Sequence, residues 1–146
     1  MSSTAASENP LALDRQVCFA LYSASRAITA AYRPLLAPLG LTYPQYLVML
    51  ALWERSPRTV RELGEALHLE SGTLSPLLKR MEANGLLTRT RSADDERQVH
   101  VALTAAGTDL RERACDVPAQ LSAATGVDPE TLAALRRTCQ ALIEES

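Results

Sequence analysis

The chain has 146 residues, a length that suits a single domain with a sizeable hydrophobic core. Hydrophobic residues make up 47% of the chain but aromatic residues only 4%, which favours helices that pack through aliphatic side chains. The apolar runs are shorter than the roughly 20 residues of a membrane span, so we expect no membrane contact. Residues 1–10 are polar, show no secretory signal and are predicted to be a disordered tail. Three cysteines, an odd number without close pairing, favour the reducing cytoplasm over a disulfide framework.

The first predicted element is a long helix over residues 14–33, where apolar side chains repeat at helical spacing. We expect Pro34, Pro38 and Gly40 to break it. Two helices should follow, because two segments have the spacing of a capping box, in which a threonine and a Glu or Gln three residues later bind each other's backbone N–H groups. The boxes are Thr42 with Gln45, opening a buried helix that ends before Ser56 and Pro57, and Thr59 with Glu62, opening a short helix to about Leu67.

A fourth helix is predicted from residue 71 to Asn84, and Gly85 follows at the position where glycine commonly ends a helix. The period of the apolar residues then changes from 3.6 to 2, which predicts strands over residues 87–90 and 98–103 with a charged turn between them. The turn between the helix that ends near Leu67 and the one that begins at residue 71 is short, so these helices must cross steeply. This order of elements predicts a winged helix-turn-helix over residues 42–103 within a mainly α fold.

The net charge of −2 does not by itself indicate nucleic-acid binding, but the distribution of charge does. Residues 71–93 hold four cations and one acid, Glu82, and therefore carry a local charge of +3. The leucines of the helix over residues 71–84 have the spacing of a core face, so its polar residues should face outward, as in a recognition helix. We therefore predict contacts with double-stranded DNA from Ser71, Thr73, Ser75, Pro76, Lys79 and Arg80 on the helix, and from Arg89, Arg91 and Arg97 in the hairpin.

The remainder of the chain is predicted to be helical. Thr104 can cap a long helix to about residue 124, with a kink at Pro118. The last helix should begin after Asp128, a favourable capping residue that is followed by proline. Because there is no internal repeat or linker, residues 11–146 are expected to form one domain.

The chain resembles the MarR family of winged-helix regulators over nearly all of this predicted domain. The resemblance is carried by residues 70–81 (ESGTLSPLLKRM), residues 84–86 (NGL) and the hairpin residues 95–97 (DER). It implies a transcriptional repressor that is an obligate homodimer, joined by helices over about residues 13–36 and 105–145, and that binds a palindromic operator. In that family, the residues that match Asp95 and Arg97 shape the hairpin and support the DNA-contacting surface.

Within this family, residues 16–25 (QVCFALYSAS), Tyr32 and residues 42–46 (TYPQY) are similar to the OhrR-type regulators, which sense organic hydroperoxides. The similarity implies that Cys18 is the redox-sensing residue and that Tyr32 and Tyr43 of the other subunit hydrogen-bond its sulfur. Tyr22 lies one helical turn from Cys18, whereas Tyr32 is about 21 Å away along a straight helix. Tyr32 can therefore meet Cys18 only if two first helices pack antiparallel across a dimer axis.

The predicted mechanism is oxidation of Cys18, as a thiolate, by an organic hydroperoxide to a sulfenic acid, followed by a shift of the first helix and release of DNA. Two-cysteine members carry a resolving cysteine near residues 121–127, and this chain has none there. We therefore expect over-oxidation or capture of the sulfenic acid by a low-molecular-weight thiol. Cys115 and Cys139 are interpreted as packed thiols, and an intersubunit disulfide through Cys115 stays open.

Two other functions share part of this pattern. A MarR-type repressor that responds to a small aromatic ligand would ignore peroxide. A thiol peroxidase would also need an activated cysteine, but Cys18 lacks a strand–turn–helix or Cys-x-x-Cys context. His68, His100 and the cysteines show no metal-ligand spacing, and no glycine-rich phosphate loop is present, so neither a metal nor a cofactor is expected.

Overall fold

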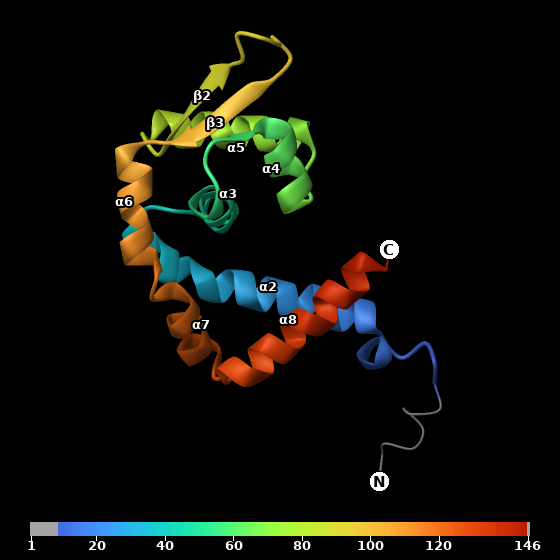
Figure 1. The fold of residues 1–146 in the computed structure, drawn as a ribbon. Coiled ribbons are helices and arrows are strands. Elements are labelled where there is room, and N and C mark those ends of the chain that lie inside the picture. Colours follow the sequence, from blue (N-terminus) through green and yellow to red (C-terminus); the bar gives the residue numbers. More distant parts are fainter. Residues whose placement is uncertain (1–8, 146) are drawn as a thin grey trace.

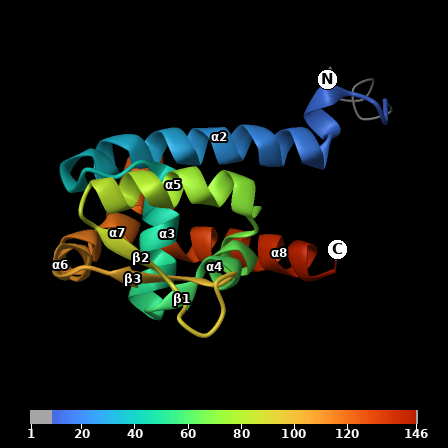
Figure 2. The same cartoon turned by 90° about the horizontal axis from the view of Figure 1, so that it is seen from above.

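The structure, a computed structural model, describes residues 9–145. Most of the tail predicted for residues 1–10 therefore lies outside the described residues. The elements form a winged unit at one end of the molecule and a group of longer helices at the other, with α3 between them (Figure 1). Both ends of the described chain lie on the same side of the molecule, beyond the start of α2 and the end of α8 (Figures 1 and 2).

The first long helix is displaced relative to its prediction. A 3₁₀ turn, η1 (Leu13–Arg15), precedes α2 (Val17–Leu36), and the extended backbone of Gln16 separates the two. The Gln16 amide donates to the carbonyls of Pro10 and Ala12, both at 2.8 Å, and so holds the preceding segment as a turn. At its other end α2 continues past Pro34, because a proline in the last turn removes only a single backbone hydrogen bond. The chain then turns through η2 (Ala37–Leu39) and the left-handed Gly40.

The winged unit follows the predicted order, and both capping boxes are confirmed. Thr42 and Gln45 open α3 (Tyr43–Glu54), and Thr59 and Glu62 open α4 (Val60–Leu67). The recognition helix is α5 (Ser71–Ala83), and the wing consists of β2 (Leu87–Arg91) and β3 (Val99–Leu103). A short strand, β1 (Arg58–Thr59), was not predicted; it pairs antiparallel with β3 and gives the sheet order β1-β3-β2.

The predicted long helix after Thr104 is two helices, α6 (Ala105–Ala114) and α7 (Val117–Thr125). Pro118 lies in the first turn of α7, where its missing N–H has no helical partner to lose, so a new helix begins there instead of one helix bending. Gly126 ends α7 in the left-handed conformation, and Asp128 caps α8 (Pro129–Glu144) as predicted.

The hydrophobic core surrounds α3, whose buried residues face α2 on one side and the winged unit on the other (Figure 1). Its fully buried side chains include Leu36, Val48, Met49, Leu52, Leu63, Leu74, Leu78, Met81, Leu87 and Val101. Among the described residues, no single helix is long and apolar enough to cross a membrane. Residues 17–39 and 43–54 meet that test only as a pair bent by 69°.

Candidate nucleic-acid interface and redox site

The recognition helix α5 has an apolar face in the core and a polar face that is exposed. Leu74, Leu78 and Met81 are fully buried against the core. The six residues predicted to contact DNA from this helix are all exposed: Ser71, Thr73, Ser75, Pro76, Lys79 and Arg80. The structure therefore places them on one accessible surface that begins at the N-terminal end of α5, where unpaired backbone N–H groups favour anions.

The turn between α4 and α5 depends on two unusual backbone positions. His68 adopts the left-handed conformation, with a φ of 56°, and ends α4. Gly64 lies so close to the turn that an added Cβ would be 2.8 Å from the carbonyl oxygen of Leu69. The Leu69 N–H in turn donates to the Gly64 carbonyl at 2.9 Å. These contacts hold α5 at a fixed angle to α4 and present its exposed face.

The wing turn is organised by Asp95. Its carboxylate accepts the Arg97 N–H at 3.0 Å and lies 3.9 Å from the Arg97 guanidinium. Its carbonyl accepts the Gln98 N–H at 3.0 Å, and the hydroxyl of Ser92 accepts the N–H groups of Asp94 and Asp95. Arg97 remains almost fully exposed at the tip, with 96% of its side chain accessible. Asp95 therefore shapes the turn while Arg97 points into solvent.

The other two hairpin arginines differ from each other. Arg91 is exposed and donates to the Glu96 carbonyl at 2.8 Å. Arg89 is only 29% exposed, and its guanidinium donates twice to Glu82 on α5, at 3.1 and 3.2 Å. The side chain of Arg89 is thus bound to the recognition helix, whereas Arg91 and Arg97 lie on the accessible surface.

A groove of about 910 Å³ lies between α4, the turn before α5 and the wing. Its lining combines both predicted DNA-contacting elements and includes Arg61, His68, Ser71, Ser75, Arg97 and Gln98. The helix and wing residues therefore border one concave surface.

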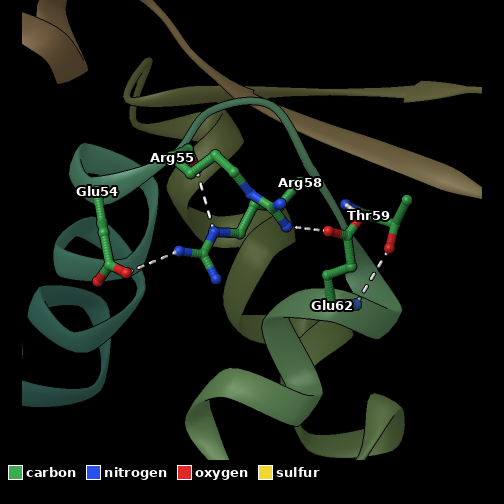
Figure 3. Close-up of polar contacts among 5 residues, drawn as sticks. All are labelled: Glu54, Arg55, Arg58, Thr59 and Glu62. Carbon is green, nitrogen blue, oxygen red and sulfur yellow. Dashed lines mark hydrogen bonds and ion pairs between the residues drawn. The ribbon is translucent and has the colours of Figure 1, made fainter.

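A polar junction anchors α4 to the end of α3 (Figure 3). The Glu62 carboxylate accepts the Thr59 N–H at 3.2 Å and also binds the Arg55 guanidinium. Arg58, whose side chain is 11% exposed, donates to the Arg55 carbonyl at 3.2 Å and pairs with Glu54 at 3.6 Å. The hydrogen bonds from Thr59, followed by the nearby arginines, lower the pKa of Glu62. The carboxylate is therefore charged and joins α3, β1 and α4 at one point.

The predicted redox residues fall into two groups. Cys18 lies exposed in the first turn of α2, and the Tyr22 side chain, one turn further on, is 60% exposed. The Arg26 guanidinium lies 5.5 Å from the centre of the Tyr22 ring and donates to its hydroxyl at 3.3 Å. This group occupies an accessible face of the N-terminal half of α2.

The second group is a cluster of tyrosines at the other end of α2. The Tyr32 ring lies between those of Tyr43 and Tyr46, with centroid distances of 5.1 and 5.6 Å. Burial, followed by the neighbouring Tyr46 and Tyr43, raises the pKa of Tyr32 to about 12. Burial likewise raises the pKa of Tyr43 and Tyr46. All three phenols therefore stay protonated at neutral pH and can donate hydrogen bonds.

Tyr46 was not among the predicted site residues, although the structure packs it directly against Tyr32. The signal for it is the three-residue spacing from Tyr43, which places both side chains on one face of α3. Within one chain, Cys18 and Tyr32 are fourteen residues apart on a continuous helix, about 21 Å along its axis. The structure of the single chain therefore brings the tyrosines together but does not bring them to the cysteine.

Helix, turn, helix and wing together define a winged helix-turn-helix protein. The family described as "Transcriptional regulator SarA/Rot" matches residues 30–113. The organic hydroperoxide resistance transcriptional regulator of Bacillus subtilis is 48% identical over 132 residues, 90% of each chain. Two solved structures of AbfR from Staphylococcus epidermidis are also similar. The overoxidised, DNA-bound form has a TM-score of 0.73 and 37% identity, covering 90% of this chain and 93% of that one. The disulfide form has a TM-score of 0.64 and 35% identity, covering 98% and 99%.

The chain belongs to this SarA/Rot family of transcriptional regulators, has the MarR-type winged-helix fold, and is a regulator of the organic-hydroperoxide-resistance type. This confirms the predicted fold class and the predicted resemblance. The relatives that match are transcriptional regulators by name, not enzymes.

Proposed function

We propose that this protein is a cytoplasmic, homodimeric repressor that binds a palindromic operator and releases it when an organic hydroperoxide oxidises Cys18. The observation that carries the proposal is the separation of two complementary groups on one chain. An exposed cysteine lies at one end of α2, and a cluster of protonated tyrosines lies at the other. Two copies packed antiparallel along α2 would join each cysteine to the other chain's tyrosines.

The exposed apolar surface supports a dimer. At the start of the described chain, Leu13 is 62% exposed and Val17 is 71% exposed, and Phe19 follows at 40%. α8 has sixteen residues, and none of them is buried in the single chain. Most of the stability of a protein helix comes from burying an apolar face. A second copy that covers α8 and the start of α2 provides that burial.

DNA binding uses α5 and the wing together. In this arrangement α5 lies in the major groove, where the small hydroxyl side chains of Ser71, Thr73 and Ser75 approach base edges, and Pro76 supplies an apolar contact. Lys79, Arg80 and Arg91 bind phosphates, and Arg97, supported by Asp95, reaches the minor groove from the wing tip. A symmetric dimer presents its recognition helices to half-sites about 34 Å apart, which matches a palindrome.

The sensing step is a two-electron transfer. The Cys18 thiolate attacks the distal oxygen of the hydroperoxide, an S–O bond forms, the O–O bond breaks, and the alkoxide leaves as the alcohol after taking a proton. The sulfur is oxidised to sulfenic acid and the peroxide is reduced. A low-molecular-weight thiol then condenses with the sulfenic acid, releasing water and forming a mixed disulfide. Tyr32 and Tyr43 of the other subunit donate hydrogen bonds to the thiolate, and Tyr22 flanks it. Oxidation of the sulfur changes these hydrogen bonds.

The test is a titration of a complex between the purified dimer and its DNA with an alkyl hydroperoxide, followed by fluorescence anisotropy of the labelled duplex. We expect release at about one peroxide per Cys18 for the wild type and for Cys115→Ser and Cys139→Ser, and no release for Cys18→Ser. Peroxide-induced release by Cys18→Ser would refute the mechanism. Release by a phenolic acid, with peroxide inert, would favour the aromatic-ligand regulator, and sustained peroxide consumption with a reductant would favour a thiol peroxidase.

A further inference from the structure

Glu82 is the only acidic residue of the basic segment 71–93, and it lies on the last turn of the recognition helix. Its carboxylate accepts three hydrogen bonds from one residue of the wing. The Arg89 backbone N–H donates to Oε2 at 2.8 Å, and its Nε and Nη2 atoms donate to Oε1 at 3.2 and 3.1 Å. These hydrogen bonds lower the pKa of Glu82, so the carboxylate stays charged at neutral pH. Charge-assisted contacts of this kind are the stronger hydrogen bonds in proteins.

The pair spans the point at which the recognition helix passes into the wing. Arg89 is the central residue of β2 and lies opposite Val101 of β3, so it is tied into the sheet. Between α5 and β2 the chain makes a tight turn at Gly85, whose φ is 78°. Apart from this turn, the polar contacts that the structure describes between the recognition helix and β2 are those between Glu82 and Arg89. They therefore set the angle between the two elements that carry the proposed DNA contacts.

We propose that Glu82 and Arg89 are a positioning pair that holds the wing at the angle where wing and helix reach one duplex together, and that Arg89 is not itself a phosphate ligand. The inference rests on the proposed DNA-binding function and changes the role of one predicted contact residue. Glu82 already occupies the Nε and Nη2 side of the guanidinium, so a phosphate could bind Arg89 side-on through these two atoms only by displacing the carboxylate, which also offsets the charge of Arg89. Among the described residues, no carboxylate of the recognition helix binds the other four predicted cations in this way: Lys79, Arg80, Arg91 and Arg97.

The two roles of Arg89 predict opposite signs for one substitution. If Glu82 merely restrains a phosphate-binding arginine, then Glu82→Gln frees that arginine, tightens DNA binding and steepens its salt dependence. If the two residues are a positioning pair, Glu82→Gln loosens the wing and weakens binding. A glutamine has one acceptor oxygen and cannot hold both the backbone N–H and the guanidinium as the carboxylate does.

The experiment measures the Kd of the reduced dimer over a series of salt concentrations. The probe is a duplex that the wild type selects from a random-sequence pool, and a shuffled duplex is the reference. We expect Glu82→Gln and Arg89→Ala each to weaken binding to the selected duplex about tenfold, and the double variant to be no weaker than either, because the residues act as one unit. The slope of log K against log salt should stay at its wild-type value in Arg89→Ala. Arg91→Ala, in the same strand, should reduce that slope by about 1.

Three results would overturn the positioning role: tighter binding by Glu82→Gln, a reduced salt slope in Arg89→Ala, or additive losses in the double variant. Thermal unfolding identifies variants that do not fold, and Arg89→Met, which keeps the apolar stem, replaces Arg89→Ala in that case. A purely structural role would lower the melting temperature but would leave affinity and selectivity unchanged well below it. If the wild type selects no duplex, the proposed function fails instead.

Discussion

Gly107 lies at the most crowded backbone contact between the winged unit and α6. A Cβ added to it would be 2.2 Å from the Leu86 carbonyl oxygen and 3.2 Å from a methyl group of Leu103. The Gly107 carbonyl accepts the Trp53 indole N–H at 2.9 Å, and its own N–H donates to the hydroxyl of Thr104 at 3.1 Å. Gly107 therefore connects α3, the turn after α5 and the start of α6, and Gly107→Ala must move backbone, not only side chains.

The size of the effect follows from these contacts. Overpacking against a rigid neighbour costs about 1–3 kcal/mol or more, and losing the Trp53 hydrogen bond costs about 1 kcal/mol. The higher helix propensity of alanine returns about 0.5–1 kcal/mol. We therefore expect Gly107→Ala to lower the free energy of unfolding by about 1–3.5 kcal/mol, which for a domain of this size corresponds to a fall in Tm of up to about 10 °C.

Trp53 makes the measurement direct, since it is the only tryptophan in the chain and its indole binds Gly107. Urea unfolding followed by tryptophan fluorescence gives both stability and local environment, and the protein concentration is kept fixed because dissociation of the proposed dimer would be coupled to unfolding. Gly72→Ala is the matched control: it lies inside α5, no atom lies within 4 Å of its added Cβ, and it should leave stability unchanged or slightly raised. Wild-type stability and an unshifted emission spectrum in Gly107→Ala would refute the reasoning.

Three further predictions concern the junction, the tyrosines and the α6 cap. Because hydrogen bonds hold the pKa of Glu62 below its ordinary value, its contribution to stability is present above that value and is lost as pH falls through the folded pKa. Glu62→Gln should therefore flatten this part of the acid unfolding curve, whereas Glu65→Gln, which touches only the exposed Arg61 pair, should not. Burial raises the pKa of Tyr32 from 10.0 to about 12, so folding disfavours ionisation of this phenol. The stability of the wild type should therefore fall as the pH rises from 10 to about 12. The fall should be smaller in Tyr32→Phe, and unfolding followed by circular dichroism measures it. Thr104→Ala removes the α6 cap and the hydroxyl that donates to the Gly85 carbonyl, and should cost about 1 kcal/mol in urea unfolding, while Thr104→Ser should retain most of it.

The winged unit could be predicted because its signals are local. The capping boxes at Thr42 and Thr59 fix two helix starts through contacts three residues apart, and Gly85 fixes the end of the recognition helix through its own backbone conformation. The two helix boundaries that were predicted wrongly lie where a local signal is compatible with more than one structure. The start of α2 is set by the Gln16 side chain binding carbonyls upstream, and α6 and α7 separate because Pro118 begins a helix instead of bending one.

The candidate site could likewise be predicted only in part. Exposure of the polar face of α5 follows from helical periodicity, which places its leucines in the core. The ion pair between Arg89 and Glu82 could not be predicted from the sequence. The alternation of residues along a strand shows which face a side chain lies on, but not which carboxylate it meets across a turn. Tyr46 was missed for a related reason: its three-residue spacing from Tyr43 places both on one face of α3, but spacing alone does not show that this face meets Tyr32.

The position of α3 suggests how the two proposed activities are joined. Tyr43 and Tyr46 lie in its first turn, and Glu54, at its last residue, pairs with Arg58 in the junction that anchors α4. Twelve helical residues span about 18 Å, and a helix packed into a dense core tilts or shifts as a body and does not compress. A displacement of the tyrosine cluster by an oxidised Cys18 of the other subunit would therefore move the Arg58 junction too, and with it the angle at which α4 and α5 face the duplex. In the proposed mechanism, the apolar surroundings of α3 would therefore serve both stability and the link between the redox site and the DNA-binding helix.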